Sequence, residues 1–204
     1  WVFRLTALPP GFPDKYELSA GANVATYNER GWTFVESCWA QLSKSRYNSL
    51  DLGRVSGELY DTLALGAPSK QKPLWSTVRE VCTTGLARQP PITPERFEEE
   101  LLTRRFTNGK EDRPLVVRLY RESFAAIMGT CDHLNFECLG WGDREAQSIA
   151  ELIRSGALCN LEELDLNGND MSDGGARAIA EAVRSGGVPC CKRILVAGNR
   201  TMSK

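Results

Sequence analysis

The carboxyl-terminal third of the chain repeats itself with a period of thirty residues. The three copies align at positions that are apolar in each copy: Cys131 with Leu161 and Cys191, Leu134 with Leu164 and Ile194, and Phe136 with Leu166 and Val196. Repetition at this period is typical of architectures in which successive copies stack, because one copy cannot bury its apolar face alone. We therefore expect residues 130–204 to form stacked coils with equivalent residues side by side.

The middle copy has a characteristic spacing of leucines and asparagine. Leu161, Leu164, Leu166 and Asn169 follow the pattern L-x-x-L-x-L-x-x-N without a gap, and the segment resembles a leucine-rich repeat. In such a repeat, Leu164 and Leu166 point inward from a short strand, and the Asn169 amide bonds the backbone of the following turn. The long period with a full helix resembles the ribonuclease-inhibitor-like subclass, which is intracellular where known.

A helix is expected to follow the middle strand. It begins at Ser172 or Asp173, and its inward residues are Ala176, Ile179, Ala180 and Val183. Two positions depart from the pattern. Leu139 replaces the asparagine in the first copy, which predicts a junction with preceding helices. The third copy keeps Asn199, but the sequence stops at Lys204 before a helix, so we expect a clipped fragment or a longer native protein.

The first part of the chain predicts a partial parallel α/β unit. Residues 1–8 are rich in β-forming residues, and a second short strand is expected at Ser49–Leu52. Between them, four apolar residues recur at helical spacing: Trp32, Val35, Trp39 and Leu42. The order strand, helix, strand is typical of parallel α/β units.

Residues 67–129 predict a proline-rich linker followed by two helices. Within the proline-rich stretch, only residues 75–86 favour a short helix. The next helix begins after Thr93, with Phe97, Leu101 and Leu102 facing inward. The second is expected from Asp112 to Met128 and to end at Gly129. Its inward residues are Val116, Leu119, Tyr120, Ser123, Phe124 and Ile127.

The predicted fold class is therefore α/β, in three segments. Residues 1–66 form a partial parallel α/β unit, residues 67–129 a linker with two helices, and residues 130–204 a leucine-rich-repeat α/β solenoid segment. The last segment holds three copies, of which the third is incomplete.

The residues between the inward leucines are the candidate binding residues. In the repeat architecture they point to the concave surface, and the thirty-residue period places them in three columns: His133, Glu163 and Arg193; Asn135, Asp165 and Leu195; Glu137, Asn167 and Ala197. The middle is acidic through Glu137, Glu163 and Asp165, so we expect a partner protein with a basic or polar patch. The alternative is that this face binds no partner and that these polar side chains only keep the protein soluble.

The stretch from Tyr27 to Glu36 indicates an enzymatic alternative. Trp32 is followed four residues later by Glu36, and the stretch resembles the W-C-x-x-E segment of Toll/interleukin-receptor (TIR) type domains, with Thr33 in place of the cysteine. The resemblance implies that Glu36 is the NAD-cleaving residue of an effector or sensor fragment, in the manner of innate-immune receptors. Such a carboxylate would stabilise the cation that forms when nicotinamide leaves. The structural alternative is that Glu36 is a solvated helix residue.

Composition argues against several other functions. With 25 basic and 26 acidic residues, the chain has a net charge of -1 and no field that would attract nucleic acid. No apolar run reaches the roughly 20 residues of a membrane span. His133 is the single histidine and the seven cysteines contain no CxxC pair, so we expect no metal or cofactor. The cysteines favour a cytoplasmic or other intracellular protein.

These observations favour a protein-interaction module or scaffold over an enzyme. A structural subunit of a large assembly, whose partners cover the end of the repeats, is a third alternative.

Overall fold

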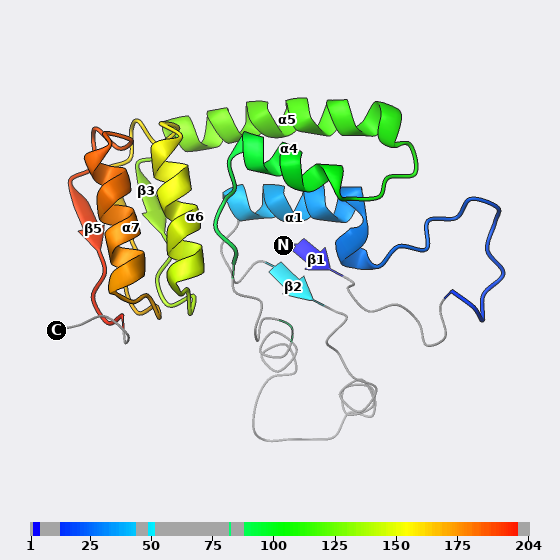
Figure 1. Ribbon diagram of the computed structural model, residues 1–204, viewed down its shortest axis with the longest axis horizontal. Helices are drawn as coiled ribbons and strands as arrows, with labels where there is room; N and C mark the ends of the chain where they lie inside the picture. The colour runs from blue at the N-terminus through cyan, green and yellow to red at the C-terminus, as the bar shows by residue number, and fades with distance from the viewer. Residues whose placement is uncertain (1, 5–12, 44–48, 52–81, 83–87, 200–204) are drawn as a thin grey trace, which may run out of the picture.

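The computed structural model describes residues 2–4, 13–43, 49–51, 82 and 88–199 (Figure 1). The helix expected within residues 75–86 lies outside this part of the chain, apart from Cys82. The elements are, in chain order, β1 (Val2–Arg4), the 3-10 helix η1 (Tyr27–Glu29), α1 (Gly31–Ser43), β2 (Ser49–Asp51), α4 (Pro94–Leu102), α5 (Gly109–Thr130), β3 (His133–Asn135), α6 (Asp143–Arg154), β4 (Glu163–Asp165), α7 (Asp173–Arg184) and β5 (Arg193–Leu195).

Strands β1 and β2 pair in parallel, with Val2 opposite Ser49 and Arg4 opposite Asp51. Helix α1 connects them, because it lies between the two strands in the chain. The predicted parallel strand, helix, strand order is therefore confirmed for this part of the chain. Parallel strands need a crossover of this kind, since a tight turn can join only antiparallel neighbours.

Helix α1 packs against α4 and α5, and these three helices are called the helical unit below. Val35, Cys38 and Leu42 form its buried side. The prediction that Trp32 belongs to this side is wrong, because 43% of its surface is exposed. Its indole instead contacts the edge of Phe106 and donates a hydrogen bond to Asp112 Oδ2 at 3.1 Å.

Helix α4 begins where the sequence predicts. The Thr93 side chain accepts a hydrogen bond from the backbone N–H of Arg96, and Pro94 occupies the first helical position, where its missing N–H costs nothing. Phe97 is fully buried. Leu102, which was also predicted to face inward, is 66% exposed, because it projects about 100° around the helix from its buried neighbour Leu101.

Helix α5 is longer than predicted. It begins at Gly109 rather than Asp112 and continues through Gly129 to Thr130. No cap ends it at Gly129, which keeps helical geometry there. Leu119 was expected on the inward side and is 36% exposed. The buried residues are Val116, Tyr120, Phe124 and Met128, at successive steps of four.

An aromatic stack joins α4 to α5. The rings of Phe97 and Tyr120 lie 4.0 Å apart at 10°, and the Tyr120 hydroxyl donates to the backbone carbonyl of Ile92 at 2.8 Å. Burial raises the pKa of the Tyr120 phenol. The hydrogen bond satisfies the one polar atom that this stack would otherwise bury without a partner.

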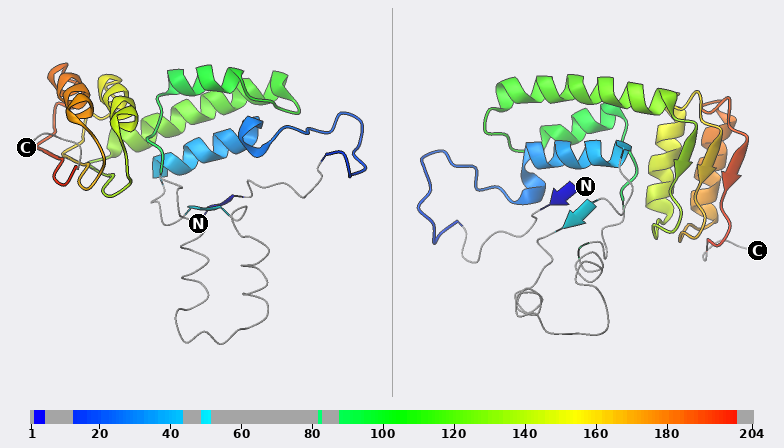
Figure 2. Two further views of the ribbon diagram at one scale, coloured as in Figure 1. Left: turned by 60° about the horizontal axis from the view of Figure 1, so that its bottom comes forward. Right: turned by 180° about the vertical axis from the view of Figure 1, so that it is seen from behind.

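The repeat segment, residues 133–199, runs strand, helix, strand, helix, strand. Strands β3, β4 and β5 form a parallel sheet in that order, and α6 and α7 cover one of its faces (Figure 2). Leu134 is opposite Leu164, which is opposite Ile194, so the thirty-residue alignment gives the observed strand register. The prediction that equivalent residues lie side by side is confirmed for these strands.

The helices of the repeat segment differ in burial. On α6, Ala146, Ile149, Ala150 and Ile153 are all buried. On α7, Ile179 is buried, whereas Ala176, Ala180 and Val183 are only half-buried. The reason is position, since α6 packs against α7 on one side and also contacts α4 through the Arg96–Glu151 ion pair, whereas α7 packs against α6 alone among the described helices.

One apolar core continues from the helical unit into the repeat segment. It includes Phe124 and Met128 of α5, Leu134 and Phe136 of the first coil, and Leu164 and Leu166 of the second coil. In the part of the chain that the structure describes, no helix has both the length and the apolar character that crossing a bilayer requires.

Candidate functional site

The candidate site is the sheet face that α6 and α7 leave uncovered. It is formed by the nine residues of the three predicted columns and is called the open sheet face: His133, Asn135, Glu137, Glu163, Asp165, Asn167, Arg193, Leu195 and Ala197. Side chains alternate across a strand, so the buried Leu134 and Leu164 fix the opposite direction for their neighbours. None of the nine residues is buried.

The parallel register places the predicted columns together. Glu163 lies opposite His133 on one side and Arg193 on the other, and Asp165 lies between Asn135 and Leu195. The structure therefore brings the first two columns together as the sequence predicts. Neighbouring strands are about 4.8 Å apart, so these side chains form one continuous surface.

An ion pair changes the charge expected for this face. Arg193 Nε lies 2.5 Å from Glu163 Oε2, and the Glu163 side chain is only 22% exposed while that of Arg193 is 63% exposed. The acidic group predicted at Glu137, Glu163 and Asp165 is thus compensated at its middle residue. Glu137 and Asp165 keep carboxylates without an ion-pair partner among the described residues.

A second set of charges lies at the start of the strands and in the residues just before them. His133 Nδ1 is 3.1 Å from Asp132 Oδ1, and this hydrogen bond is the main cause that lowers the pKa of the Asp132 carboxyl. Lys192 Nζ is 2.8 Å from Glu162 Oε1 and lowers the pKa of Glu162 in the same way. Both pairs are well exposed, so they set local charge and contribute little to stability.

Three of the predicted binding residues also support the backbone. Asn135 Oδ1 accepts from the N–H of Glu137 at 3.1 Å, and Asp165 Oδ1 accepts from the N–H of Asn167 at 2.9 Å. Each bond closes a turn at the end of its strand. Asn167 Oδ1 accepts from the N–H of Ala197 at 2.7 Å and so joins adjacent coils. Binding tests must therefore preserve these acceptors.

Buried asparagines hold the coils in register. Asn169 Oδ1 accepts from the N–H groups of Leu139 and Trp141 at 3.0 Å each, and Asn169 Nδ2 donates to the carbonyls of Phe136 and Leu166. Asn169 thus bonds its own coil and the preceding one, and the turn role predicted for it is confirmed.

Asn199 repeats this arrangement one coil later. It accepts from the N–H of Met171 and donates to the carbonyls of Leu166 and Val196. The departure at Leu139 follows from the same rule, because the first coil has no earlier coil to bond. Leu139 is instead an 8% exposed part of the core.

Asp143 is a structural residue that the sequence pattern shows only as an aligned position. Its carboxylate accepts from the N–H and Oγ of Ser172, at 2.8 and 2.5 Å, and from the N–H of Gly175 at 3.1 Å. The Ser172 hydroxyl is the main cause that lowers the pKa of Asp143, followed by the backbone donors. A carboxylate from α6 therefore stabilises the amino terminus of α7.

The helical unit covers the first coil through polar contacts as well as apolar ones. Arg88 donates to the carbonyls of Gln41 and Asn135 and stacks over Phe136, with its guanidinium 4.8 Å from the ring centroid. The Trp141 indole donates to the Arg88 carbonyl at 2.6 Å. No repeat spacing signals these contacts, so sequence analysis missed them. They hold the near end of the sheet to the helical unit.

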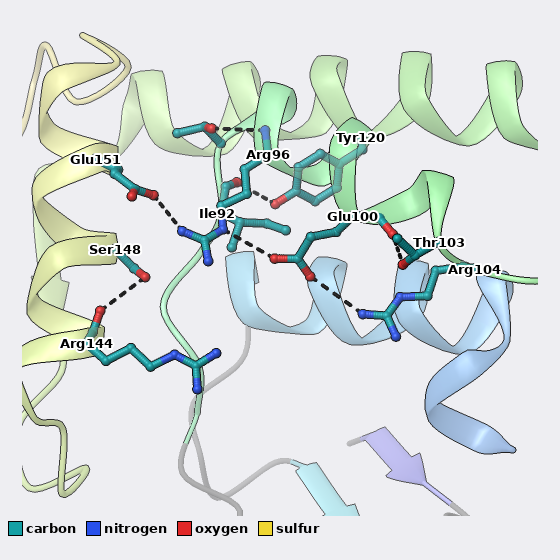
Figure 3. Close-up of polar contacts among 10 residues, drawn as sticks. Ile92, Arg96, Glu100, Thr103, Arg104, Tyr120, Arg144, Ser148 and Glu151 are labelled. Carbon is teal, nitrogen blue, oxygen red and sulfur yellow. Dashed lines mark hydrogen bonds and ion pairs between the residues drawn. The ribbon is translucent and has the colours of Figure 1, made fainter.

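Arg96 makes a further bridge between the two parts (Figure 3). Its guanidinium lies 3.2 Å from Glu100 on α4 and 2.8 Å from Glu151 on α6. Arg104 approaches the other oxygen of Glu100 at 3.6 Å. These side chains are about one quarter to one half exposed, so the network orients α4 against α6 and adds modest stability.

Glu36, the residue implied by the TIR resemblance, is exposed on α1. Within the described part of the chain its carboxylate makes no hydrogen bond or ion pair. Trp32 lies four residues earlier, and its indole N–H donates a hydrogen bond to Asp112. Neither the Glu36 nor the Trp32 side chain lines the pockets that the described residues form along α1, α4, α5 and α6.

Comparison with known proteins gives one match. The family model described as Leucine Rich repeat matches residues 157–180, which include β4 and the first two turns of α7. No curated protein and no solved structure matches the chain. The residues matched are those that carry Leu161, Leu164, Leu166 and Asn169, and the match supports a leucine-rich repeat in this part of the chain.

Proposed function

We propose that the chain is a protein-interaction module that binds its partner through the open sheet face. The observation that carries the proposal is the parallel register of β3, β4 and β5, which places exposed polar residues from three coils on one surface. A leucine-rich repeat supports protein partners in general. Specificity then comes from the exposed side chains and not from the fold.

The partner's chemistry follows from the charges left over on the face. Because Glu163 is paired with Arg193, the carboxylates open to a partner are those of Glu137 and Asp165. We infer a basic or polar patch whose lysine or arginine side chains approach these two carboxylates and whose other groups bond Asn135. Charge complementarity of this kind favours the correct partner and raises the association rate.

In this proposal the stacked coils act as a scaffold of the solenoid type. The full helix after β3 and β4 and the thirty-residue period support the ribonuclease-inhibitor-like subclass. The subclass in turn supports an intracellular location. The helical unit closes the near end of the sheet through Arg88 and Trp141, as an end cap does in repeat proteins.

Site-specific photocrosslinking tests the proposal. A photoreactive amino acid replaces His133 or Arg193 on the open sheet face, or Arg177 on the outer side of α7, and the protein is irradiated in cells of its source. We expect the two sheet positions to crosslink one shared protein and the Arg177 position to miss it. Crosslinking from Arg177 alone would contradict the proposal.

Charge variants then measure affinity for the crosslinked partner. Glu137→Arg should weaken binding by about tenfold, because it places a cation opposite the partner's basic patch. Asp165→Asn removes a charge while keeping the Oδ1 acceptor for Asn167, so its loss of affinity reports on charge and not on folding. Glu181→Arg, exposed on α7, is the matched control and should leave the affinity unchanged.

A structural subunit of a larger assembly is the second candidate. The observation that favours it is the half-exposed apolar edge at Ile194, Val196 and Val183, whose equivalents Leu164, Leu166 and Ile153 are fully buried. If a partner subunit covers this edge, size-exclusion chromatography of native extract should show the protein only in a large complex, and Ile194→Arg should release it. Elution of the native protein at its own mass would reject this candidate.

NAD cleavage by Glu36 is the remaining alternative, and no contact described above favours it. Incubation with NAD followed by measurement of free nicotinamide tests it directly. We expect wild-type protein and Glu36→Ala to give the same background. Nicotinamide release that disappears in Glu36→Ala would instead support a TIR-like effector of the innate-immune type.

A further inference from the structure

A second surface on the molecule has the features of a binding site. It is a groove between α4 and the first half of α5, here called the α4–α5 groove, with a volume of about 660 Å³. Its apolar floor is formed by Leu102, Pro114 and Val117, and its rim by Lys110, Arg113 and Arg118. The groove lies on the helical unit and shares no residue with the open sheet face.

The floor exposes apolar surface that the fold leaves uncovered. Leu102 is 66% exposed at the last position of α4, which is more than any other large apolar residue in the described part of the chain. Pro114 is also exposed, and Val117 is half-buried beneath them. A concave apolar surface of this kind gains free energy when another side chain covers it.

The rim carries an excess of positive charge. The groove is lined by four cations and two carboxylates, and one carboxylate, Glu98, pairs with Arg121 at 3.3 Å. Arg113 gives one donor to the Arg104 carbonyl and lies over Phe106, so no carboxylate compensates it among the described residues. Lys110 and Arg118 likewise make no ion pair there. Three cations thus face the single remaining carboxylate, Glu122.

We propose that the α4–α5 groove binds a short acidic segment of another protein. The segment places an aliphatic side chain over Leu102 and Val117 and sets its carboxylates against Lys110 and Arg118. Arg113 lies half-buried beside the floor and adds positive charge to the same side of the groove. Binding in this mode uses an apolar anchor for affinity and flanking charges for orientation.

The geometry favours a peptide over a phosphate-rich surface. A membrane or a nucleic acid presents many phosphates and would meet Glu98 and Glu122 on the same rim. A peptide can instead place its carboxylates selectively on the cationic side. The groove also has a volume suited to a few side chains, in the range typical of ligand pockets.

Fluorescence anisotropy with a labelled model peptide tests the proposal. The probe is a short helical peptide with leucines on one face and glutamates flanking them, and the control peptide has lysine in place of each glutamate. We expect the acidic peptide to bind at least about tenfold more tightly than the basic one. Equal binding of the two peptides would overturn the proposal.

Variants of the chain locate the site. Lys110→Glu with Arg118→Glu should weaken the acidic peptide by about tenfold or more, and Leu102→Asp should weaken it similarly. Arg177→Glu makes the same charge change on α7 and should have no effect. Circular dichroism checks folding. If Leu102→Asp loses helix content, the Lys110→Glu, Arg118→Glu variant alone serves as the test of the site.

Two further outcomes would reject the inference. Equal affinity of the acidic peptide for wild-type protein and all variants would mean that the peptide binds outside the α4–α5 groove. Phosphatidylserine vesicles that bind wild-type protein but not the Lys110→Glu, Arg118→Glu variant, without any binding of the peptide, would show that the groove faces a membrane.

Discussion

Asn169 is fully buried and uses both polar atoms of its amide, accepting from two backbone N–H groups and donating to three backbone carbonyls. A buried polar side chain is stable only when it is hydrogen-bonded, and here the partners come from two successive coils. The same residue that marks the family pattern in the sequence thus holds the strand register on which the open sheet face depends. Asp143 performs a related task for the helices, linking α6 to the start of α7.

Replacing Asn169 should destabilise the whole repeat segment. Asn169→Ala removes hydrogen bonds to five backbone groups, and we expect a loss of about 2–4 kcal/mol in the free energy of unfolding. Urea denaturation measures this loss. Asn160→Ala removes an exposed asparagine with a single bond to the Gly129 carbonyl and should cost less than about 1 kcal/mol. Equal losses in the two variants would contradict the role assigned to Asn169.

The pH dependence of stability should identify the Asp143 contribution. Because the Ser172 hydroxyl and the backbone donors hold the folded pKa of Asp143 below its unfolded value, the carboxylate stabilises the fold above the unfolded pKa, and this stabilisation is lost as the pH falls through the folded value. Asp143→Asn keeps similar shape without the charge. Thermal unfolding should therefore show a lower Tm for Asp143→Asn at pH 7, and the difference from wild type should shrink as the pH falls through the acid range in which this carboxyl is protonated. A constant difference across this range would exclude the carboxylate as the cause.

At the scale of elements, the sequence predicted the start of α4, the start of α7 and the strand register of the repeats. These depend on local signals, such as Thr93 before Pro94, Ser172 before α7 and the recurring leucines. It misplaced Leu102 and Trp32, whose burial depends on which side of a helix meets its neighbour. Helical periodicity predicts an apolar stripe, but it does not show which residues at the edge of the stripe are buried.

Two glycines with different surroundings give a matched pair of tests. A Cβ built at Gly187 would lie 2.0 Å from the Ile153 carbonyl oxygen, so Gly187→Ala should force the coils apart and cost roughly 1–3 kcal/mol. Gly129 lies within α5, and no atom lies within 4 Å of a Cβ built there. Gly129→Ala should stabilise the protein by up to about 1 kcal/mol, because alanine favours helix. Chemical denaturation of both variants measures the two opposite changes, and the same sign for both would contradict the packing described.

For the whole molecule, the principal feature is that the helical unit and the repeat segment share one core. Arg88, Trp141, Arg96 and Glu151 join them by polar contacts in addition. Sequence analysis predicted the parts but not their junction, because contacts between a helix pair and a repeat follow neither a period nor a motif. The positions of the candidate residues in the sheet were predicted better, since these residues lie at fixed positions of the repeat. The charge of the candidate site was not, because the pairing of Glu163 with Arg193 depends on side-chain geometry.

A shared core predicts that both parts unfold together. Trp141→Phe keeps an aromatic ring in the junction but loses the bond to the Arg88 carbonyl, and should cost about 1 kcal/mol. Amide hydrogen exchange should then show faster exchange in α5 as well as in α6. A change limited to the repeat segment would indicate that the two parts unfold independently.

The central claim is that the parallel strands of the repeat segment present one surface to a partner protein. Amide hydrogen exchange of the chain, alone and bound to the protein crosslinked from His133, tests it most directly. The account predicts slower exchange on binding in residues 133–137, 163–167 and 193–197, with α6 and α7 unchanged. Slower exchange confined to α6 and α7, with the strands unaffected, would contradict it.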